Sequence, residues 1–178
     1  MSTLSEDKNF LTAGIQELEK YLLSDELFWP LTGTGVNLPR LTIGGLLLAR
    51  ARLTARMAPQ AIELHMEAIQ SKWRSAWERK AAREIHARFN LWRSYLEDYR
   101  QSPTSHANDY PHQVQWRVML QMLSGEVMSS LPEVEALTGL DQILKANWIP
   151  GDFVWDPDLV PSFPESIYWF LYGKLKTI

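Results

Sequence analysis

The middle of the chain mixes basic and aromatic side chains, and this part is best equipped to bind an anionic partner. The run from Lys72 to Lys80 contains two tryptophans among its lysines and arginines, and further arginines follow. Arginine binds carboxylate and phosphate oxygens through two parallel N–H groups, and a nucleic-acid backbone is held by several cations on one surface. We therefore predict a candidate partner or anion surface within the basic segment 40–93, formed by Arg52, Arg56, Lys72, Arg79 and Arg83.

The same charges have a second explanation in the acidic ends of the chain. Residues 1–37 hold two basic and six acidic side chains, residues 38–93 hold eleven and four, and residues 101–178 hold four and nine. Acidic helices that pack on the basic ones would neutralise them within the molecule. We favour this packing interpretation and keep a nucleic-acid-binding module as the alternative function.

A small-molecule or metal-binding helical bundle is a third hypothesis. Its candidate polar groups are histidine and glutamate side chains. Glu63 and Glu67 share one helical face, with His65 roughly opposite and His86 farther along. Di-iron bundles need Glu-x-x-His on one face, and helical zinc sites need two histidines four residues apart. Neither spacing occurs, so we expect no metal and no cofactor.

Catalytic motifs are equally weak. The segment 33–35 (Gly-Thr-Gly) resembles a fragment of a phosphate loop, but the remaining glycines, the lysine and a preceding strand are missing. No Gly-x-Ser-x-Gly elbow is present, and the chain has no cysteine. We therefore predict no catalytic residue and favour a protein that is not an enzyme.

Hydropathy and composition predict a cytoplasmic protein without a membrane partner. The first residues lack the basic and apolar regions of a signal peptide. The most apolar run, 41–53, contains Arg50 and Arg52 and is too short to span a bilayer. The absence of cysteine fits a reducing compartment.

Helical spacing dominates the chain and predicts an all-α fold. Thr3 and Glu6 form a capping-box pattern for a first helix that ends near Leu23. A connector follows over 25–40, and a second, largely buried helix is expected over 40–57. Its Gly44 and Gly45 cost helix stability, so we expect them to allow a neighbouring helix to approach closely.

A third helix of unusual length is predicted from Pro59 to Tyr99. Its apolar positions recur every three or four residues without a break: Ile62, Met66, Ile69, Trp73, Trp77, Ala81, Ile85, Phe89, Trp92, Leu96 and Tyr99. A helix of about forty residues spans roughly 60 Å, more than the diameter of a domain of this size. One part must then project, be kinked or be covered by another subunit.

Tryptophan is the second unusual feature, with eight in 178 residues. Because tryptophan and arginine are enriched at interface hot spots, our leading functional hypothesis is a non-enzymatic interaction protein. It would associate with itself or with another protein through the long helix. The candidate aromatic interface consists of Trp73, Trp77, Trp92 and Tyr99.

The C-terminal third completes a predicted single domain of residues 1–178. We expect a fourth helix over 112–129 and a fifth over 130–146, capped by Ser130. Prolines make 148–161 an extended strap, and a final helix begins at Ser162. No strand pair with a hairpin turn is visible. The prediction is a helical bundle of five to six helices with one very long central helix and a Pro/Trp-rich strap.

Overall fold

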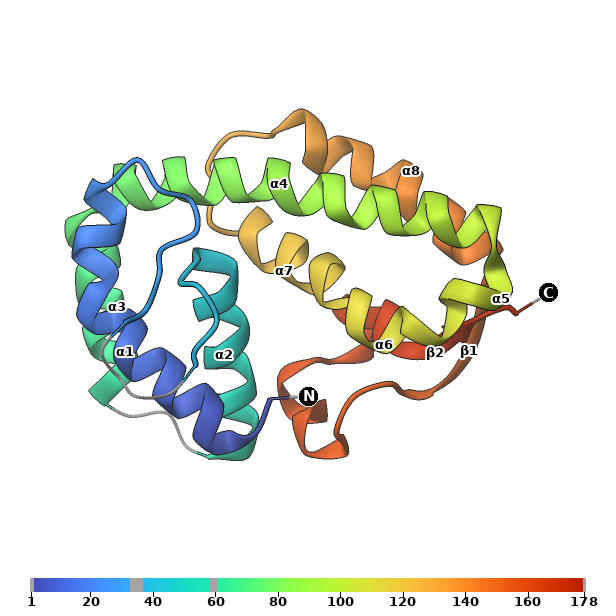
Figure 1. Cartoon of the computed structure of the whole chain (residues 1–178), viewed down its shortest axis with the longest axis horizontal. Coiled ribbons are helices and arrows are strands. Elements are labelled where there is room, and N and C mark those ends of the chain that lie inside the picture. Colours follow the sequence, from blue (N-terminus) through green and yellow to red (C-terminus); the bar gives the residue numbers. More distant parts are fainter. Residues whose placement is uncertain (1, 33–36, 58–60, 178) are drawn as a thin grey trace.

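The computed structural model describes residues 2–32, 37–57 and 61–177, and these are mostly helical, as predicted. A small two-stranded sheet is added near the C-terminus (Figure 1). The main elements are α1 (Leu4–Leu23), α2 (Ile43–Arg56), α3 (Ala61–Lys72), α4 (Arg74–Gln101), α7 (Gln115–Ser124), α8 (Pro132–Ala146), β1 (Trp148–Phe153) and β2 (Tyr172–Leu175). The shorter elements are α5 (Pro103–His106), η1 (Ala107–Asp109), α6 (Tyr110–Gln113), η2 (Pro157–Ser162), α9 (Glu165–Tyr168) and η3 (Trp169–Leu171).

The predicted capping box at the start of α1 is confirmed. The Thr3 hydroxyl accepts a hydrogen bond from the Glu6 amide, and the Glu6 carboxylate accepts one from the Thr3 amide. These two bonds satisfy amides that the first helical turn leaves without a partner. The predicted end at Leu23 is confirmed as well. This helix packs along α2 on one side of the molecule (Figure 1).

The second helix, α2, begins three residues later than predicted because Thr42 caps it. The Thr42 hydroxyl accepts a hydrogen bond from the Gly45 amide at 3.0 Å. Gly44 allows the close approach that its position suggested. A Cβ atom at Gly44 would lie 2.6 Å from Oε1 of Glu84, on α4. Any side chain at position 44 would therefore have to displace the Glu84 carboxylate.

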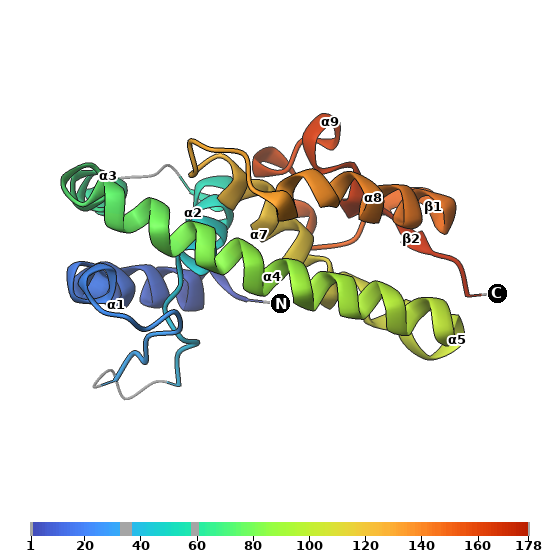
Figure 2. The same cartoon turned by 90° about the horizontal axis from the view of Figure 1, so that it is seen from above.

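The predicted long helix is kinked, which is one of the three outcomes that its length required. Trp73 leaves helical geometry (φ −113°, ψ 35°) and separates α3 from α4, although backbone hydrogen bonds link Trp73 to both helices. The two parts follow different neighbours: α3 packs on α1, whereas α4 runs across α7 and α8 (Figure 2). The 28 residues of α4 span roughly 42 Å. The predicted start at Pro59 lies outside the described residues.

The predicted final helix is wrong, because part of that segment pairs with the strap. β1 and β2 run antiparallel, with Trp148 opposite Leu175 and Pro150 opposite Gly173. Gly173 has a φ of +157°, and a Cβ there would lie 2.3 Å from the Ile149 carbonyl oxygen. A tight turn does not join the two strands. Instead η2, α9 and η3 connect them, which is why a search for hairpin turns misses the pair.

Helix starts in this third of the chain also differ from the predicted ones. The fourth predicted helix is the shorter α7, preceded by the single turn α6. Leu131, and not Ser130, occupies the cap position of α8, and the Ser130 hydroxyl donates to Glu135 instead. Ser162 caps no helix, because α9 begins after Pro164. Among the described residues, no helix combines the length and apolar character that a membrane crossing requires.

Candidate ligand-binding cleft

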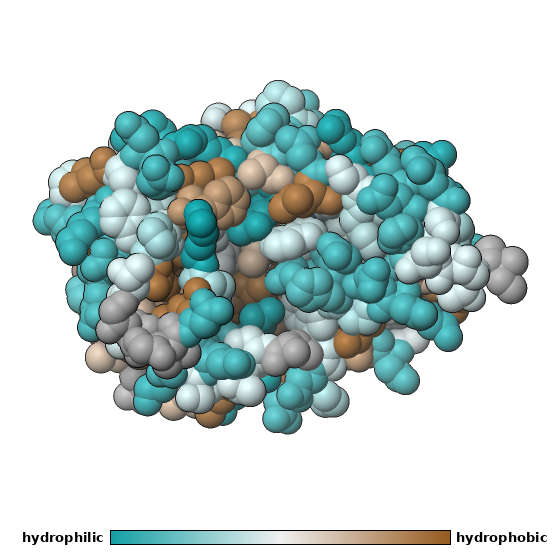
Figure 3. Space-filling model, viewed as in Figure 1, coloured by the Kyte–Doolittle hydropathy of each residue, from teal (hydrophilic) through white to brown (hydrophobic). Residues whose placement is uncertain are grey.

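A cleft of about 710 Å³ lies between α2 and α7. Figure 3 shows a hollow near the middle of this face of the molecule, with hydrophobic residues inside it and hydrophilic ones around it. The N-terminal part of α1, the segment 37–42 and residues 154–155 of the strap complete its walls. Its size falls within the range of clefts that hold small organic molecules.

Two helical stripes form the facing walls of the cleft. α2 contributes Gly45, Leu48, Ala49 and Arg52. The opposite wall comes from α6 and α7, and its residues follow the same i, i+3, i+4, i+7 spacing: His112, Gln115, Trp116 and Met119. This spacing places four side chains on one face of a helix. Gly45 and Ala49 of α2 occupy little of the space between the helices, and Trp116 and Met119 of α7 line it with apolar surface.

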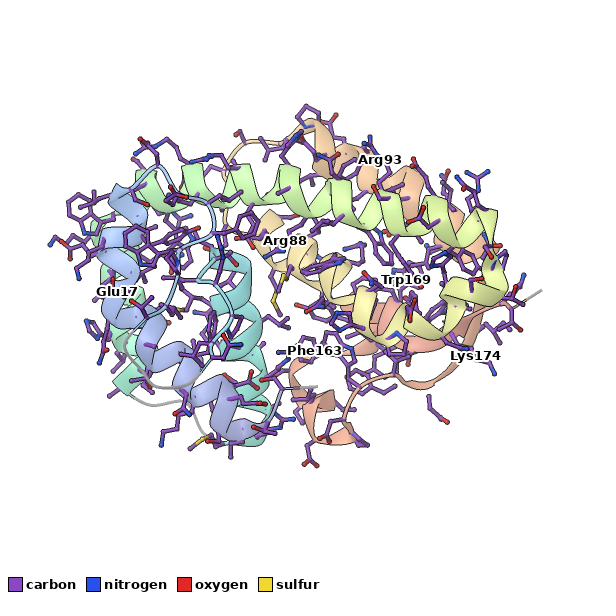
Figure 4. The ribbon with its side chains drawn as sticks, viewed as in Figure 1. Glu17, Arg88, Arg93, Phe163, Trp169 and Lys174 are labelled. Atoms are coloured by element: carbon purple, nitrogen blue, oxygen red, sulfur yellow. The ribbon has the colours of Figure 1, made fainter. Side chains whose placement is uncertain are left out.

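Arg88 projects into the cleft from the side of α4 that faces α2 and α7 (Figure 4). Its side chain is only 9% exposed, and its Nε donates a hydrogen bond to Oε1 of Glu84 at 3.1 Å. The guanidinium carbon lies 4.7 Å from the ring centroid of Trp116 and 5.3 Å from that of Phe28. Two aromatic rings and one carboxylate therefore fix the orientation of this cation.

Glu84 is fully buried, and two different groups compensate its charge. Its Oε2 accepts a hydrogen bond from the Gly44 amide at 2.8 Å, while Oε1 accepts the bond from Arg88. Gly44 belongs to the first turn of α2, where the helix dipole favours a negative charge. The Glu84 carboxylate is therefore stabilised by the Gly44 amide as well as by Arg88.

Asp7 forms the second buried charged group, next to the C-terminal part of α2. Its carboxylate lies 3.6 Å from Nη1 of Arg52 and 3.2 Å from Nη1 of Arg56, and it accepts a hydrogen bond from the Ser2 hydroxyl. Burial raises the pKa of Asp7, although the Ser2 hydroxyl and both arginines act in the opposite direction. Burial lowers the pKa of Arg52, and this effect outweighs the negative charge of Asp7, which acts to raise it.

Arginine also ties the strap to this end of the cleft. Nη2 of Arg56 donates to Asp156 at 3.5 Å, across 100 residues of sequence. The Arg52 guanidinium lies 5.6 Å from the ring centroid of Trp155, whose indole N–H donates to the Pro111 carbonyl oxygen. These contacts hold the strap over the ends of α1 and α2, so Trp155 becomes part of the cleft wall.

Metal binding and covalent catalysis each require a particular arrangement of polar side chains. Within the described ranges, no group of His, Cys, Asp and Glu side chains has the arrangement of a metal site. The cleft's histidine, His112, contacts the Gln115 side chain, while the Ser2 hydroxyl donates to Asp7. His112 therefore contacts an amide, and the carboxylate that Ser2 contacts also faces Arg52 and Arg56.

The five cations selected from the sequence do not form one surface. Arg52 and Arg56 turn toward Asp7. Lys72 lies 3.5 Å from Glu19, and the Arg83 guanidinium donates to the Asp25 carbonyl oxygen at 2.9 Å. Arg79 is exposed on α4. Contacts within the chain, chiefly with α1 and the residues that follow it, thus engage most of this set, as the packing interpretation expects.

Most of the candidate aromatic interface lies in the core. Trp77 and Trp92 have no exposed surface, and Tyr99 is 2% exposed. The Trp77 indole donates to Glu126, and the Tyr99 hydroxyl donates to the Lys176 carbonyl oxygen, so their polar atoms bind within the chain. Trp73, at the kink between α3 and α4, is half-buried. The set therefore offers little surface to a second molecule.

The histidine and glutamate residues considered for a metal also stay apart. Glu63 accepts a hydrogen bond from Thr54, and His86 contacts Glu133 at 2.7 Å. His65 and Glu67 are exposed on α3. The Gly-Thr-Gly segment at 33–35 lies outside the described residues.

Apart from Arg52, sequence reasoning missed the residues that build the cleft. Arg88 was visible only as one more cation of the basic segment, although Glu84 and Arg88 stand four residues apart beside the apolar ladder of α4. That spacing could have suggested a buried ion pair. Trp116 and Trp155 carried no signal of a shared site, because 39 positions separate them in the sequence.

Comparison with protein-family models, with curated proteins and with solved structures finds no significant match to this chain.

Proposed function

We propose that the protein binds a small amphipathic organic molecule in the cleft between α2 and α7. The observation that carries the proposal is the cleft itself, whose lining combines apolar side chains with polar and charged ones. Ligand sites in proteins combine mostly apolar walls with a small number of placed polar side chains. Leu48, Met119 and Trp116 supply the former, and Arg88 supplies the latter.

A neutral fluorescent probe, N-phenyl-1-naphthylamine, tests this proposal. Its emission rises in apolar surroundings, so a saturable rise with one site per chain is expected. Gln115→Trp fills the cleft from the wall of α7 and should weaken binding at least about tenfold, the cost of roughly 1.4 kcal/mol. Gln142→Trp, at an exposed position of α8, is the matched control and should leave binding unchanged.

Failure of the test has a clear form. Absence of saturable binding, or equal binding by both tryptophan variants, would contradict a ligand site in this cleft. Thermal unfolding of both variants confirms that the comparison is made between folded proteins.

Self-association and nucleic-acid binding stay predictions. Light scattering at high micromolar concentration tests the first, and a strictly monomeric protein would argue against it. Salt-dependent retention on heparin tests the second, because phosphate contacts weaken steeply as salt rises. Trp77 and Trp92 are buried, and Arg52 and Arg56 face Asp7. These four residues therefore offer no specific contact for self-association or for nucleic-acid binding.

A further inference from the structure

The polar groups of the cleft differ between its two ends, and this difference indicates what kind of ligand fits. We infer that the cleft binds an organic monocarboxylate, whose carboxylate is held by the Nη atoms of Arg88. The apolar body of the ligand then lies along Leu48, Met119 and Trp116. This inference rests on the proposed function, because it concerns the same cleft.

The geometry of Arg88 leaves the N–H groups on its Nη atoms available to a planar acceptor. A guanidinium has five N–H donors, and the Nε donor bonds to Glu84. Within the described part of the chain, the two Nη atoms make no hydrogen bond to a protein acceptor. Since Trp116 and Phe28 lie near the guanidinium, its edge is the side open to an acceptor. Two parallel N–H groups on that edge match the two oxygens of a carboxylate.

The charge at this end of the cleft is suited to an anion. Glu84 shares its negative charge between Arg88 and the Gly44 amide at the N-terminus of α2. Arg88 therefore retains positive charge toward the cleft. Arg40, an exposed residue that also lines the cleft, adds a second positive charge.

The other end of the cleft is unsuited to an anion. Asp7 and Glu6 line it, and the two arginines nearest to Asp7 are already engaged with its carboxylate. A carboxylate placed there would meet the like charges of Asp7 and Glu6. Although Nε of Arg52 has no hydrogen-bond partner among the described residues, the guanidinium of Arg52 already faces the Asp7 charge. The ligand is thus oriented with its anionic group toward α4.

The neighbours of Arg88 favour a single-charged carboxylate over a phosphate. Phe28 and Trp116 surround the guanidinium with apolar surface, and the Trp116 indole N–H donates to Gln113 instead of the cleft. A phosphate dianion needs more donors than the Arg88 fork supplies, and the second cation at this end, Arg40, is exposed to solvent. A monocarboxylate needs two donors and gains from the apolar walls.

Decanoate and 1-decanol form a matched pair of probes, because they share an apolar chain and differ in the charged group. Titration calorimetry at pH 7.4, below the concentrations at which decanoate aggregates, gives both affinities. A charge-assisted hydrogen bond predicts roughly 10- to 100-fold tighter binding of decanoate. Gln115→Trp should weaken the binding of both probes.

Arg88→Lys tests the residue, because lysine keeps the charge and loses the planar fork. We expect it to reduce the preference for decanoate roughly tenfold, while Arg93→Lys, on the exposed side of α4, leaves the preference intact. The double variant Glu84→Gln with Arg88→Met removes both charges together. It provides a second test if the lysine variant fails to fold, and it should bind both probes equally.

The possible outcomes separate this inference from the proposed function. Equal affinity for decanoate and decanol in the unmodified protein, with both probes excluded by Gln115→Trp, overturns the carboxylate inference and leaves the ligand site intact. An unchanged preference for decanoate in the folded Arg88 variants also overturns it. Binding of neither probe argues against the carboxylate inference, and the naphthylamine titration then decides the proposed function separately.

Discussion

Glu84 and Asp7 are both buried carboxylates beside arginine, and they lie at opposite ends of α2. Glu84 contacts the first turn of that helix through the Gly44 amide, whereas Asp7 contacts Arg52 and Arg56 near its end. At the Glu84 end, one arginine lines the cleft and bonds to the carboxylate through a single nitrogen. At the Asp7 end, two arginines converge on one carboxylate.

If the proposed function holds, the same residue types serve stability in one place and recognition in another. The Asp7 group links α1, α2 and the strap, since Arg56 also binds Asp156 of the strap. The Glu84 group places a cation, because its carboxylate is satisfied jointly by a helix terminus and an arginine. Buried ion pairs add little net stability by themselves, but removing one partner is costly.

The largest effect is expected from Glu84→Ala. It leaves Arg88 buried without its carboxylate and the Gly44 amide without its acceptor, so we expect a loss of about 3–5 kcal/mol in the free energy of unfolding. Urea unfolding followed by circular dichroism measures it. Glu78→Ala removes the partner of Arg74 from another i, i+4 pair, one that is partly exposed, and should cost no more than about 1 kcal/mol. Similar losses for both variants would contradict the special role of Glu84.

Gly44→Ala probes the same contact through shape. The added methyl group would lie 2.6 Å from Oε1 of Glu84 and 3.3 Å from the Leu123 side chain. We expect a loss of about 1–3 kcal/mol from this overpacking. Gly139→Ala is the control within α8, where no atom lies within 4 Å of the added group. There the better helix propensity of alanine should stabilise the protein by up to about 1 kcal/mol. A stabilising Gly44→Ala would show that the two helices have room to spare.

The pH dependence of stability distinguishes the Asp7 end. Burial raises the pKa of Asp7 in the folded protein above the ordinary value of 3.8, so the folded state binds its proton more tightly than the unfolded chain. Its contribution to stability is therefore largest at low pH and declines as pH rises from 3.8 through the raised pKa. Asp7→Asn removes this decline, which urea unfolding at a series of pH values between 3.5 and 7 detects. Parallel pH profiles for Asp7→Asn and the unmodified protein would contradict the assignment.

The exposed contact between Glu133 and His86 should give the smallest effect and the opposite sign. The hydrogen bond from His86 lowers the pKa of Glu133, so its contribution is present above the ordinary value of 4.5 and is lost as pH falls through the lowered pKa. Glu133→Gln should change the free energy of unfolding at pH 7 by less than about 1 kcal/mol. The same urea series measures both the size and the slope, and a loss as large as that of Glu84→Ala would be incompatible with an exposed pair.

Local signals in the sequence identified several elements correctly. Thr3 and Glu6 predicted the start of α1, because a capping box involves residues three positions apart. The spacing of apolar residues predicted α2 and the helical nature of 61–101. Gly44 predicted a close helix approach, since a glycine in a helix is costly without such a use.

Longer-range features escaped prediction because the partners are far apart in the chain. The apolar ladder continues through Trp73, so periodicity alone cannot show that α3 follows α1 while α4 follows α7 and α8. Likewise, β1 and β2 are joined by three short helical segments, and the residues of each alone resemble a strap or a helix start.

The chain's sequence by itself determined its mostly helical character, the capped first helix and the glycine at the crossing of α2 and α4, all of which follow from local propensity and spacing. The tertiary structure alone decided the kink at Trp73, the sheet and the cleft. The bond between Gly44 and Glu84 spans 40 residues, and that between Arg56 and Asp156 spans 100. Contacts at such separations arise only when packing brings the helices together, so Arg88 gains its place in the cleft from the fold and not from its neighbours in the sequence.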